Sequence, residues 1–248
     1  MNDQTEKRFR ELAERSWSRG IPCYTDFLDL SEQTVLTRIR AGLPQPEIRL
    51  FGGAEGCERV MAGFGVSEED GTDGFPLACV KITPAGLKFA GEMSHRDVLG
   101  SLMSLGFERS LLGDIILREK EAWVFCAERI ADYLCDGLTS VRRTSVKASR
   151  TEVPPSGELF RTRREVIQVS SERMDALVSH AVRLSRAGAQ SLFPAGKVFL
   201  DGAECLRTDA EPRPGQIVSV RGMGRFRFLG AEGQSKKGKW NTVIERYF

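Results

Sequence analysis

The chain has 248 residues, of which 41% are hydrophobic and 28% are charged. This composition is that of a folded protein and excludes global disorder, and no apolar run approaches the roughly 20 residues that would span a membrane. Residues 1–15 mix acids and bases without an apolar signal core, so we expect a cytoplasmic protein. The six cysteines contain no Cys-x-x-Cys pair, which favours scattered thiols over disulfides or a zinc site.

The net charge of +2 is unevenly distributed along the chain. Residues 1–75 carry 9 Lys and Arg against 14 Asp and Glu, and residues 76–160 carry 11 of each. Residues 161–248 carry 16 against 9, a net charge of +7. This polarity predicts that the last third binds a polyanion, although charge alone also fits a solvated basic face.

Residues 1–75 are predicted to form an N-terminal α/β domain. A first helix has apolar residues from Phe9 to Trp17 at helical spacing, and Ser31 is the expected N-cap of a second helix. Strands are expected at 48–51 and 60–64, and the acidic stretch 68–74 is typical of a linker. The glycine-rich residues 52–56 lack the Gly-Lys-Ser/Thr ending of a phosphate-binding loop, so a plain turn is expected there.

Residues 76–155 show the order β-α-β-β-α-β of a ferredoxin-like domain. The expected strands are 77–83, 114–118, 122–127 and 141–148, with helices from Ser94 to 106 and over 128–138. Ser94 and Asp97 form a variant capping box. Base-stacking aromatic residues are not evident on this sheet, so any RNA contact should be basic. The candidates are Arg142 and Arg143, with Lys147 and Arg150 beyond them.

A Pro-containing linker at 151–157 leads to the third domain, residues 160–248. A strand-like stretch at 160–169 precedes a helix from about Ser171 and a second helix capped by Ser185. Strands follow at 197–200, 204–206, 217–221 and 225–229, with Asp201-Gly202 as a two-residue hairpin turn. The expected core is Met174, Leu177, Leu184, Leu192, Val198 and Val218.

Basic side chains remain outside that core, namely Arg173, Arg186, Lys197, Arg221 and Arg225. Arg186 falls in the first turn of the second helix, where free backbone N–H groups favour an anion and an arginine adds a bidentate fork. Gln190, one turn further, is expected to reach a phosphate or a 2′-hydroxyl. Asp175 is expected to anchor the first helix or to pair with Arg173. Lys236 and Lys237 lie in a predicted hairpin loop, which suits either a phosphate contact or a solvated loop without a ligand.

The segments Arg173-Met174-Asp175-Ala176-Leu177, Ser185-Arg186, Gly196-Lys197-Val198 and 218–222 together resemble the ribosomal protein S-four RNA-binding domain, or αL motif. Residues 94–106 and 112–115, with Gly52-Gly53 and Glu58-Arg59, resemble the YlmH family. The resemblance implies binding to rRNA and tRNA on the large ribosomal subunit, in quality control of stalled peptidyl-tRNA complexes. A link to cell division is also attached to that family. We therefore expect an α+β protein of three small domains, monomeric, with no cofactor and no small-molecule substrate.

Catalysis is not expected. The two histidines, His95 and His180, have no evident nucleophile partner, and no His/Cys cluster has metal-ligand spacing. Asp114 could be a lone carboxylate base, but a turn residue that opens a strand is the simpler interpretation. The alternative is an rRNA-modifying enzyme, a methyltransferase or pseudouridine synthase, that uses the same RNA-targeting module.

Overall fold

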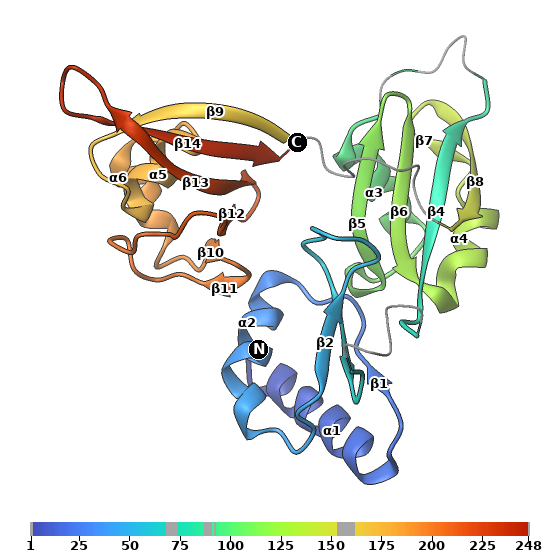
Figure 1. The fold of residues 1–248 in the computed structure, drawn as a ribbon. Coiled ribbons are helices and arrows are strands. Elements are labelled where there is room, and N and C mark those ends of the chain that lie inside the picture. Colours follow the sequence, from blue (N-terminus) through green and yellow to red (C-terminus); the bar gives the residue numbers. More distant parts are fainter. Residues whose placement is uncertain (1, 68–73, 87–90, 92, 153–161, 248) are drawn as a thin grey trace. The chain divides into compact units, whose positions relative to one another are not determined.

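The computed structural model of the chain describes residues 2–67, 74–86, 91, 93–152 and 162–247. They form two compact units, Met1–Leu159 and Phe160–Phe248, of mixed α and β structure (Figure 1). The first unit contains two sheets and spans both 1–75 and 76–155. The predicted linkers at 68–74 and 151–157 lie mostly outside the described residues.

The N-terminal part of the first unit is a three-stranded sheet with two helices. Its elements are α1 (Asn2–Arg19), β1 (Cys23–Tyr24), α2 (Leu30–Ile39), η1 (Arg40–Gly42), β2 (Ile48–Phe51) and β3 (Met61–Phe64), in the strand order β1-β3-β2. Phe9 and Ala13 of α1 pack with Val35 and Leu36 of α2 in one core. The predicted cap of the second helix was wrong, because Asp29 rather than Ser31 accepts the Glu32 N–H and completes a capping box with Glu32.

The second sheet of this unit has five strands in the order β5-β6-β4-β8-β7. Its elements are β4 (Leu77–Pro84), α3 (His95–Ser104), η3 (Arg109–Leu111), β5 (Leu112–Arg118), β6 (Glu121–Ala127), η4 (Glu128–Ile130), α4 (Ala131–Gly137), β7 (Ser140–Val141) and β8 (Thr144–Thr151). Strand β6 is antiparallel to both β4 and β5, so these two run parallel on either side of it. This is the strand arrangement of a split βαβ unit.

The last strand of this sheet differs from its prediction. A single strand was expected over 141–148, but the chain turns back at Arg142 and Arg143, and Val141 pairs with Thr144 across the turn. Arg142 has a φ of +54°, a value that L-residues other than Asn and Asp rarely adopt. The two arginines therefore lie at the tip of a tight hairpin rather than on a strand.

Arg59 and Asp114 join the two sheets of the first unit. The Arg59 guanidinium donates to the carbonyl oxygens of Leu112 and Phe27, both at 2.9 Å. The Asp114 carboxylate accepts the backbone N–H groups of Glu58 at 2.6 Å and Arg59 at 3.1 Å. Asp114 lies within β5, where the strand register shifts. Its carboxylate oxygens link β5 to the 58–59 backbone of the first sheet.

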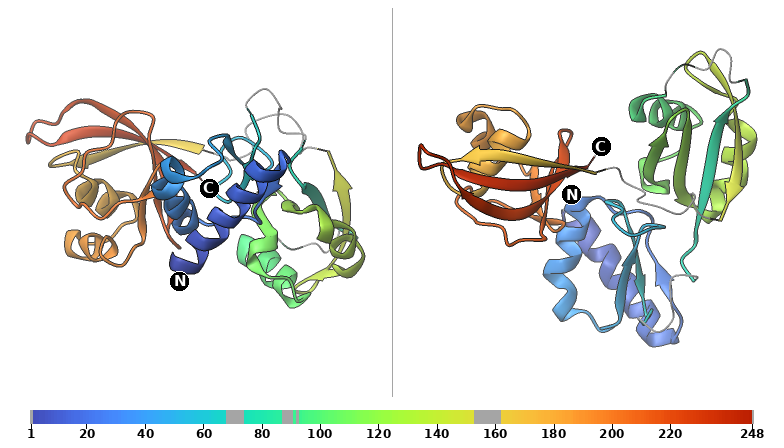
Figure 2. Two further views of the ribbon diagram at one scale, coloured as in Figure 1. Left: turned by 90° about the horizontal axis from the view of Figure 1, so that it is seen from below. Right: turned by 45° about the horizontal axis from the view of Figure 1, so that its top comes forward.

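The second unit is a six-stranded antiparallel sheet in the order β11-β10-β12-β13-β14-β9, with α5 and α6 on one face (Figure 1 and Figure 2). Its elements are β9 (Thr162–Val169), α5 (Met174–Ala181), α6 (Arg186–Leu192), β10 (Val198–Leu200), β11 (Ala203–Glu204), β12 (Ile217–Val220), β13 (Gly224–Gln234) and β14 (Trp240–Tyr247). The predicted core is confirmed: five of its residues are buried and Leu184 packs against them. The predicted start of the first helix was wrong, because α5 begins at Met174 and not near Ser171.

The hairpin turn of the second unit forms where the Asp-Gly pair predicts it. Asp201 and Gly202 have φ values of +47° and +80°, the left-handed conformations that a two-residue turn requires. The Asp201 carboxylate also accepts from the Ile217 N–H at 2.7 Å, which ties the turn to β12.

Candidate nucleic-acid interface

A fully buried carboxylate, Asp175, lies at the start of α5. The backbone N–H groups of Met174 and Asp175 donate to the carbonyl oxygens of Ala210 and Thr208, at 2.8 and 3.0 Å. The 208–210 segment therefore covers this helix start. The neighbours of Asp175 from Met174 to Val178 are all buried, so its charge must be balanced by other side chains.

Three side chains converge on Asp175: Arg173 at the N-cap of α5, and Arg186 and Gln190 of α6. Arg186 donates through Nε to Oδ2 at 3.1 Å and through Nη2 to Oδ1 at 3.3 Å. Gln190 donates through Nε2 to Oδ2 at 2.8 Å, and Nε of Arg173 lies 3.4 Å from Oδ1. Burial alone would raise the pKa of Asp175, but the hydrogen bonds from Arg186 and Gln190 and the nearby positive charges outweigh it and lower that pKa. The carboxylate therefore stays ionised, binds Arg186 through two hydrogen bonds and pairs with Arg173 by charge, without a hydrogen bond to the Nε of Arg173.

Both arginines remain accessible to a ligand. The side chains of Arg173 and Arg186 are 38% and 49% exposed, and a guanidinium carries five N–H donors, of which Arg186 uses two for Asp175. Two fixed, partly exposed guanidiniums are suited to the oxygens of a phosphate group. We name Arg173, Asp175, Arg186 and Gln190 the Asp175 cluster.

The structure changes the expected roles of two residues in this cluster. Arg186 was predicted to add to an anion site at a helix N-terminus, but α6 has only seven residues and the guanidinium is oriented by Asp175. The amide nitrogen of Gln190 also donates to Asp175, which leaves its second N–H and its carbonyl oxygen for a ligand. Ser185 caps α6 as predicted, because its hydroxyl oxygen accepts the Gly188 N–H at 3.1 Å.

The other predicted contacts of the second unit lie on its sheet. Lys197 and Arg221 meet at adjoining strand ends, where the Arg221 N–H donates to the Lys197 carbonyl oxygen at 2.8 Å. The Arg221 guanidinium lies 5.5 Å from the centre of the Phe199 ring, and that of Arg225 lies 4.5 Å from the centre of the Tyr247 ring. These aromatic contacts hold the arginines against the sheet.

Lys236 and Lys237 lie in the 235–239 loop between β13 and β14, and both are exposed. The loop is closed by two hydrogen bonds: the Ser235 N–H donates to the Lys239 carbonyl oxygen at 2.7 Å, and the Lys239 N–H donates to the Ser235 hydroxyl oxygen at 3.1 Å. Its position at the tip of a long hairpin fits either of the roles considered for it from the sequence.

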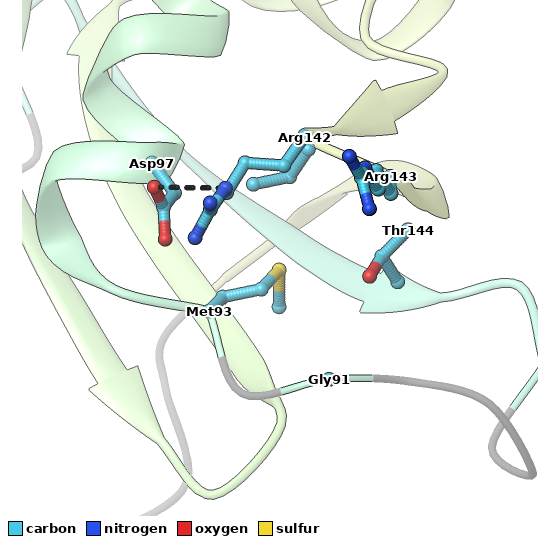
Figure 3. A pocket seen from close by; sticks show the side chains of 7 residues that line it. Gly91, Met93, Asp97, Arg142, Arg143 and Thr144 are labelled. Carbon is cyan, nitrogen blue, oxygen red and sulfur yellow. Dashed lines mark ion pairs between the residues drawn. The ribbon is translucent and has the colours of Figure 1, made fainter.

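A second basic site lies in the first unit, where the start of α3 faces the β7–β8 turn. The side chains around it enclose a hollow of about 270 Å³ lined by Met93, Asp97, Arg142, Arg143 and Thr144, among others (Figure 3). Arg142 reaches toward Asp97, with 3.6 Å between Nε and Oδ1. Hydrogen bonds from Ser94 and the charge of Arg142 lower the pKa of Asp97. The sequence indicated both arginines but not Met93 and Thr144.

Two of the residues considered for catalysis, His95 and Asp114, have defined surroundings. Burial and the charge of Arg109 lower the pKa of His95, and the Asp114 oxygens accept backbone N–H groups. Within the described residues there is no group of three or more His, Cys, Asp or Glu that could hold a metal ion. No helix in the same residues is long and apolar enough to cross a membrane.

Comparison with known proteins gives evidence that does not depend on the geometry of the site. Residues 72–154 match the family model described as "Putative RNA-binding domain in YlmH". The "Ribosome-associated protein quality control protein P2" of Bacillus subtilis (strain 168) is 28% identical over 229 residues, which span 90% of this chain and 86% of that protein. The solved structure "Cell division protein ylmH from Streptococcus pneumoniae" covers 60% of this chain and 90% of its own, with 16% identity and a TM-score of 0.48. The family model and the Bacillus subtilis relative confirm the resemblance to YlmH proteins seen in the sequence.

Proposed function

We propose that this YlmH-type chain is a non-catalytic RNA-binding protein that acts on the large ribosomal subunit. Its RNA would be rRNA together with tRNA, and its role would be quality control of stalled peptidyl-tRNA complexes. The name of the Bacillus subtilis relative and the matched RNA-binding domain support an RNA-binding, ribosome-associated role. We further propose that the second unit is the S-four type module that the sequence suggests.

The Asp175 cluster is the observation that carries this proposal. A surface arginine loses side-chain entropy when it is fixed on a phosphate, and Asp175 removes part of that cost by fixing two guanidiniums in advance. The cluster contributes two of the positive charges and one of the negative charges in residues 161–248, which carry a net charge of +7. Steering by the whole segment and gripping by the cluster together suit a folded RNA.

Co-sedimentation with purified large ribosomal subunits tests the proposal. We expect the double substitution Arg173→Ala and Arg186→Ala to weaken binding by about 10- to 100-fold, since each removes charge-assisted contacts to phosphate. The dependence of log K on log salt concentration should become shallower by about 1.5 to 2, in proportion to the two lost phosphate contacts.

The matched control is the double substitution Arg164→Ala and Arg213→Ala. Both are exposed arginines of the second unit, and neither contacts Asp175. This control removes the same charge and should weaken binding much less. Equal losses in the two variants would reduce the cluster to general charge, and wild-type sedimentation of the first variant would contradict the proposed contact face.

The non-catalytic part of the proposal has its own test. The purified protein is incubated with ribosomal RNA and S-adenosylmethionine, and the RNA is analysed by mass spectrometry. We expect no change in nucleoside mass. A methylated or isomerised nucleoside that depends on the protein would favour the modifying enzyme considered from the sequence.

A further inference from the structure

The hollow between α3 and the β7–β8 turn has the size and lining of a small binding site. Its volume of about 270 Å³ adjoins a second hollow of about 570 Å³, lined by Ser94, Arg96 and the shared residues Met93, Asp97 and Arg142. The two together fall in the volume range of small-ligand pockets, roughly 300 to 1,000 Å³. Figure 3 shows Met93 below Arg142 on one side of the hollow, with Arg143 and Thr144 on the other.

The charge of these hollows is positive. Arg96, Arg142 and Arg143 contribute three positive charges against the one negative charge of Asp97, which gives a net charge of +2. The Arg142 side chain is 73% exposed, and its ion pair with Asp97 is long at 3.6 Å. The Asp97 side chain is only 17% exposed, but the pair is long and its arginine is solvent-exposed, so an incoming phosphate can take over the Arg142 guanidinium at small cost.

The backbone at the turn gives an independent indication of function. Position 142 is the first central residue of a two-residue hairpin turn and has a positive φ, where glycine is the unstrained choice. The chain has an arginine there instead. Strained residues of this kind are concentrated at binding sites, where the position of the side chain outweighs the cost in stability.

The remaining lining fits the ribose of a nucleotide. The Thr144 hydroxyl can donate to a phosphate oxygen or accept from a 2′-hydroxyl. Met93 is only 7% exposed, so it closes the apolar side of the hollow and offers no stacking surface. A phosphate fork, a hydroxyl and an apolar wall thus border one hollow.

We propose that this hollow binds one nucleotide of an RNA strand, with its phosphate held by Arg142 and Arg143 and its ribose hydroxyl bound by Thr144. The inference rests on the proposed function only in taking RNA as the ligand. It places a second RNA contact in the first unit, with residues that do not belong to the Asp175 cluster.

The test uses the full wild-type chain as the parent, because removing both arginines of the Asp175 cluster would leave a buried carboxylate without its ion pairs. Fluorescence anisotropy measures its affinity for a labelled single-stranded RNA oligonucleotide. Adding Arg142→Gly or Arg143→Ala should weaken binding about tenfold in each case, as expected for loss of a charge-assisted contact. Glycine fits the backbone at position 142, so this variant keeps its fold.

Arg129→Ala is the matched control, because Arg129 is an exposed arginine of the same unit, paired with Asp26 and absent from the hollow. It should bind the RNA like the parent. Unchanged affinity in the Arg142 and Arg143 variants would overturn the inference, and so would an equal loss in the Arg129 variant. Large-subunit sedimentation of the otherwise wild-type chain tests the proposed function separately.

A competition experiment separates a nucleotide site from a simple anion site. Uridine monophosphate should displace the labelled RNA at a lower concentration than inorganic phosphate does. Equal potency of the two competitors would overturn the part of the inference that assigns the ribose to Thr144.

Discussion

The two pairs of arginines in this protein are held in opposite ways. Arg173 and Arg186 converge on a carboxylate that is fully buried, whereas Arg142 pairs across 3.6 Å with Asp97 at the surface. The first pair is oriented by neighbouring side chains, and the second is presented by a strained backbone turn. An arginine can therefore be positioned for a phosphate either by side chains that contact its guanidinium or by the main-chain conformation of the turn that carries it.

The two settings predict different responses to the loss of their carboxylates. Asp175→Asn and Asp97→Asn each raise the net charge by one, so simple electrostatics would predict tighter RNA binding in both. We expect Asp175→Asn instead to weaken binding and to lower the free energy of unfolding of the second unit by about 3 kcal/mol, because two arginines lose a buried partner. Hydrogen exchange of α5 and α6 measures the stability, and anisotropy measures the binding.

Asp97→Asn is the control for that experiment. It removes the carboxylate of the α3 capping box, whose side chain is 17% exposed, and should lower stability much less than Asp175→Asn, with RNA binding unchanged or tighter. Binding is compared at a temperature at which hydrogen exchange shows α5 and α6 still folded. Tighter binding in both variants would show that charge, and not orientation, governs the Asp175 cluster.

Acid should affect the second unit through the same carboxylate. The pKa of Asp175 in the folded protein is lower than in the unfolded chain, where it is about 3.9. The stabilisation is therefore fully present above about pH 4 and is lost as the pH falls through the folded pKa. Hydrogen exchange of α5 and α6 between pH 6 and the acid range, roughly pH 2 to 4, should show this loss.

Asp175→Asn should flatten that acid response without abolishing it. Glu165 of the same unit also has a lowered pKa, because its carboxylate accepts hydrogen bonds from Arg246. An Asp175→Asn protein with the full wild-type acid response would contradict a role for Asp175 in stabilising the folded unit.

The sequence predicts most elements of the fold because their signals are local. The Ser94–Asp97 capping box, the Ser185 cap and the Asp201-Gly202 turn each act within four residues, and the structure has all three. The cap of α2 was misassigned because Asp29 and Ser31 are both good capping residues two positions apart. The YlmH resemblance was likewise visible in short runs such as 94–106.

The features that the sequence does not predict depend on contacts between distant residues. The Asp175 cluster joins residues 11 and 15 positions apart, so no helical period indicates it. A signal does exist, since a lone acid among buried neighbours from Met174 to Val178 requires a partner. The Arg142 turn has no such signal, because arginine is not a turn former and the flanking residues suit a continuous strand.

The smallest expected effect concerns the backbone strain at the Arg142 turn. Arg142→Gly should raise the free energy of unfolding of the first unit by about 1 kcal/mol, because glycine adopts a positive φ without the steric cost borne by other residues. Thermal unfolding measures the change. A variant that is more stable and yet binds RNA less tightly would show that the arginine is kept for its ligand and not for the fold.

The adjacent arginine supplies the control for this last prediction. Arg143 occupies the second central position of the turn and is not among the residues with positive φ. Arg143→Gly therefore relieves no strain and only makes the unfolded chain more flexible, so it should lower stability by about 0.5 to 1 kcal/mol. Opposite signs at two neighbouring positions would separate backbone strain from charge, since both substitutions remove one arginine from the same turn. If both variants changed the free energy of unfolding in the same direction, the backbone strain at Arg142 would not be what positions this arginine.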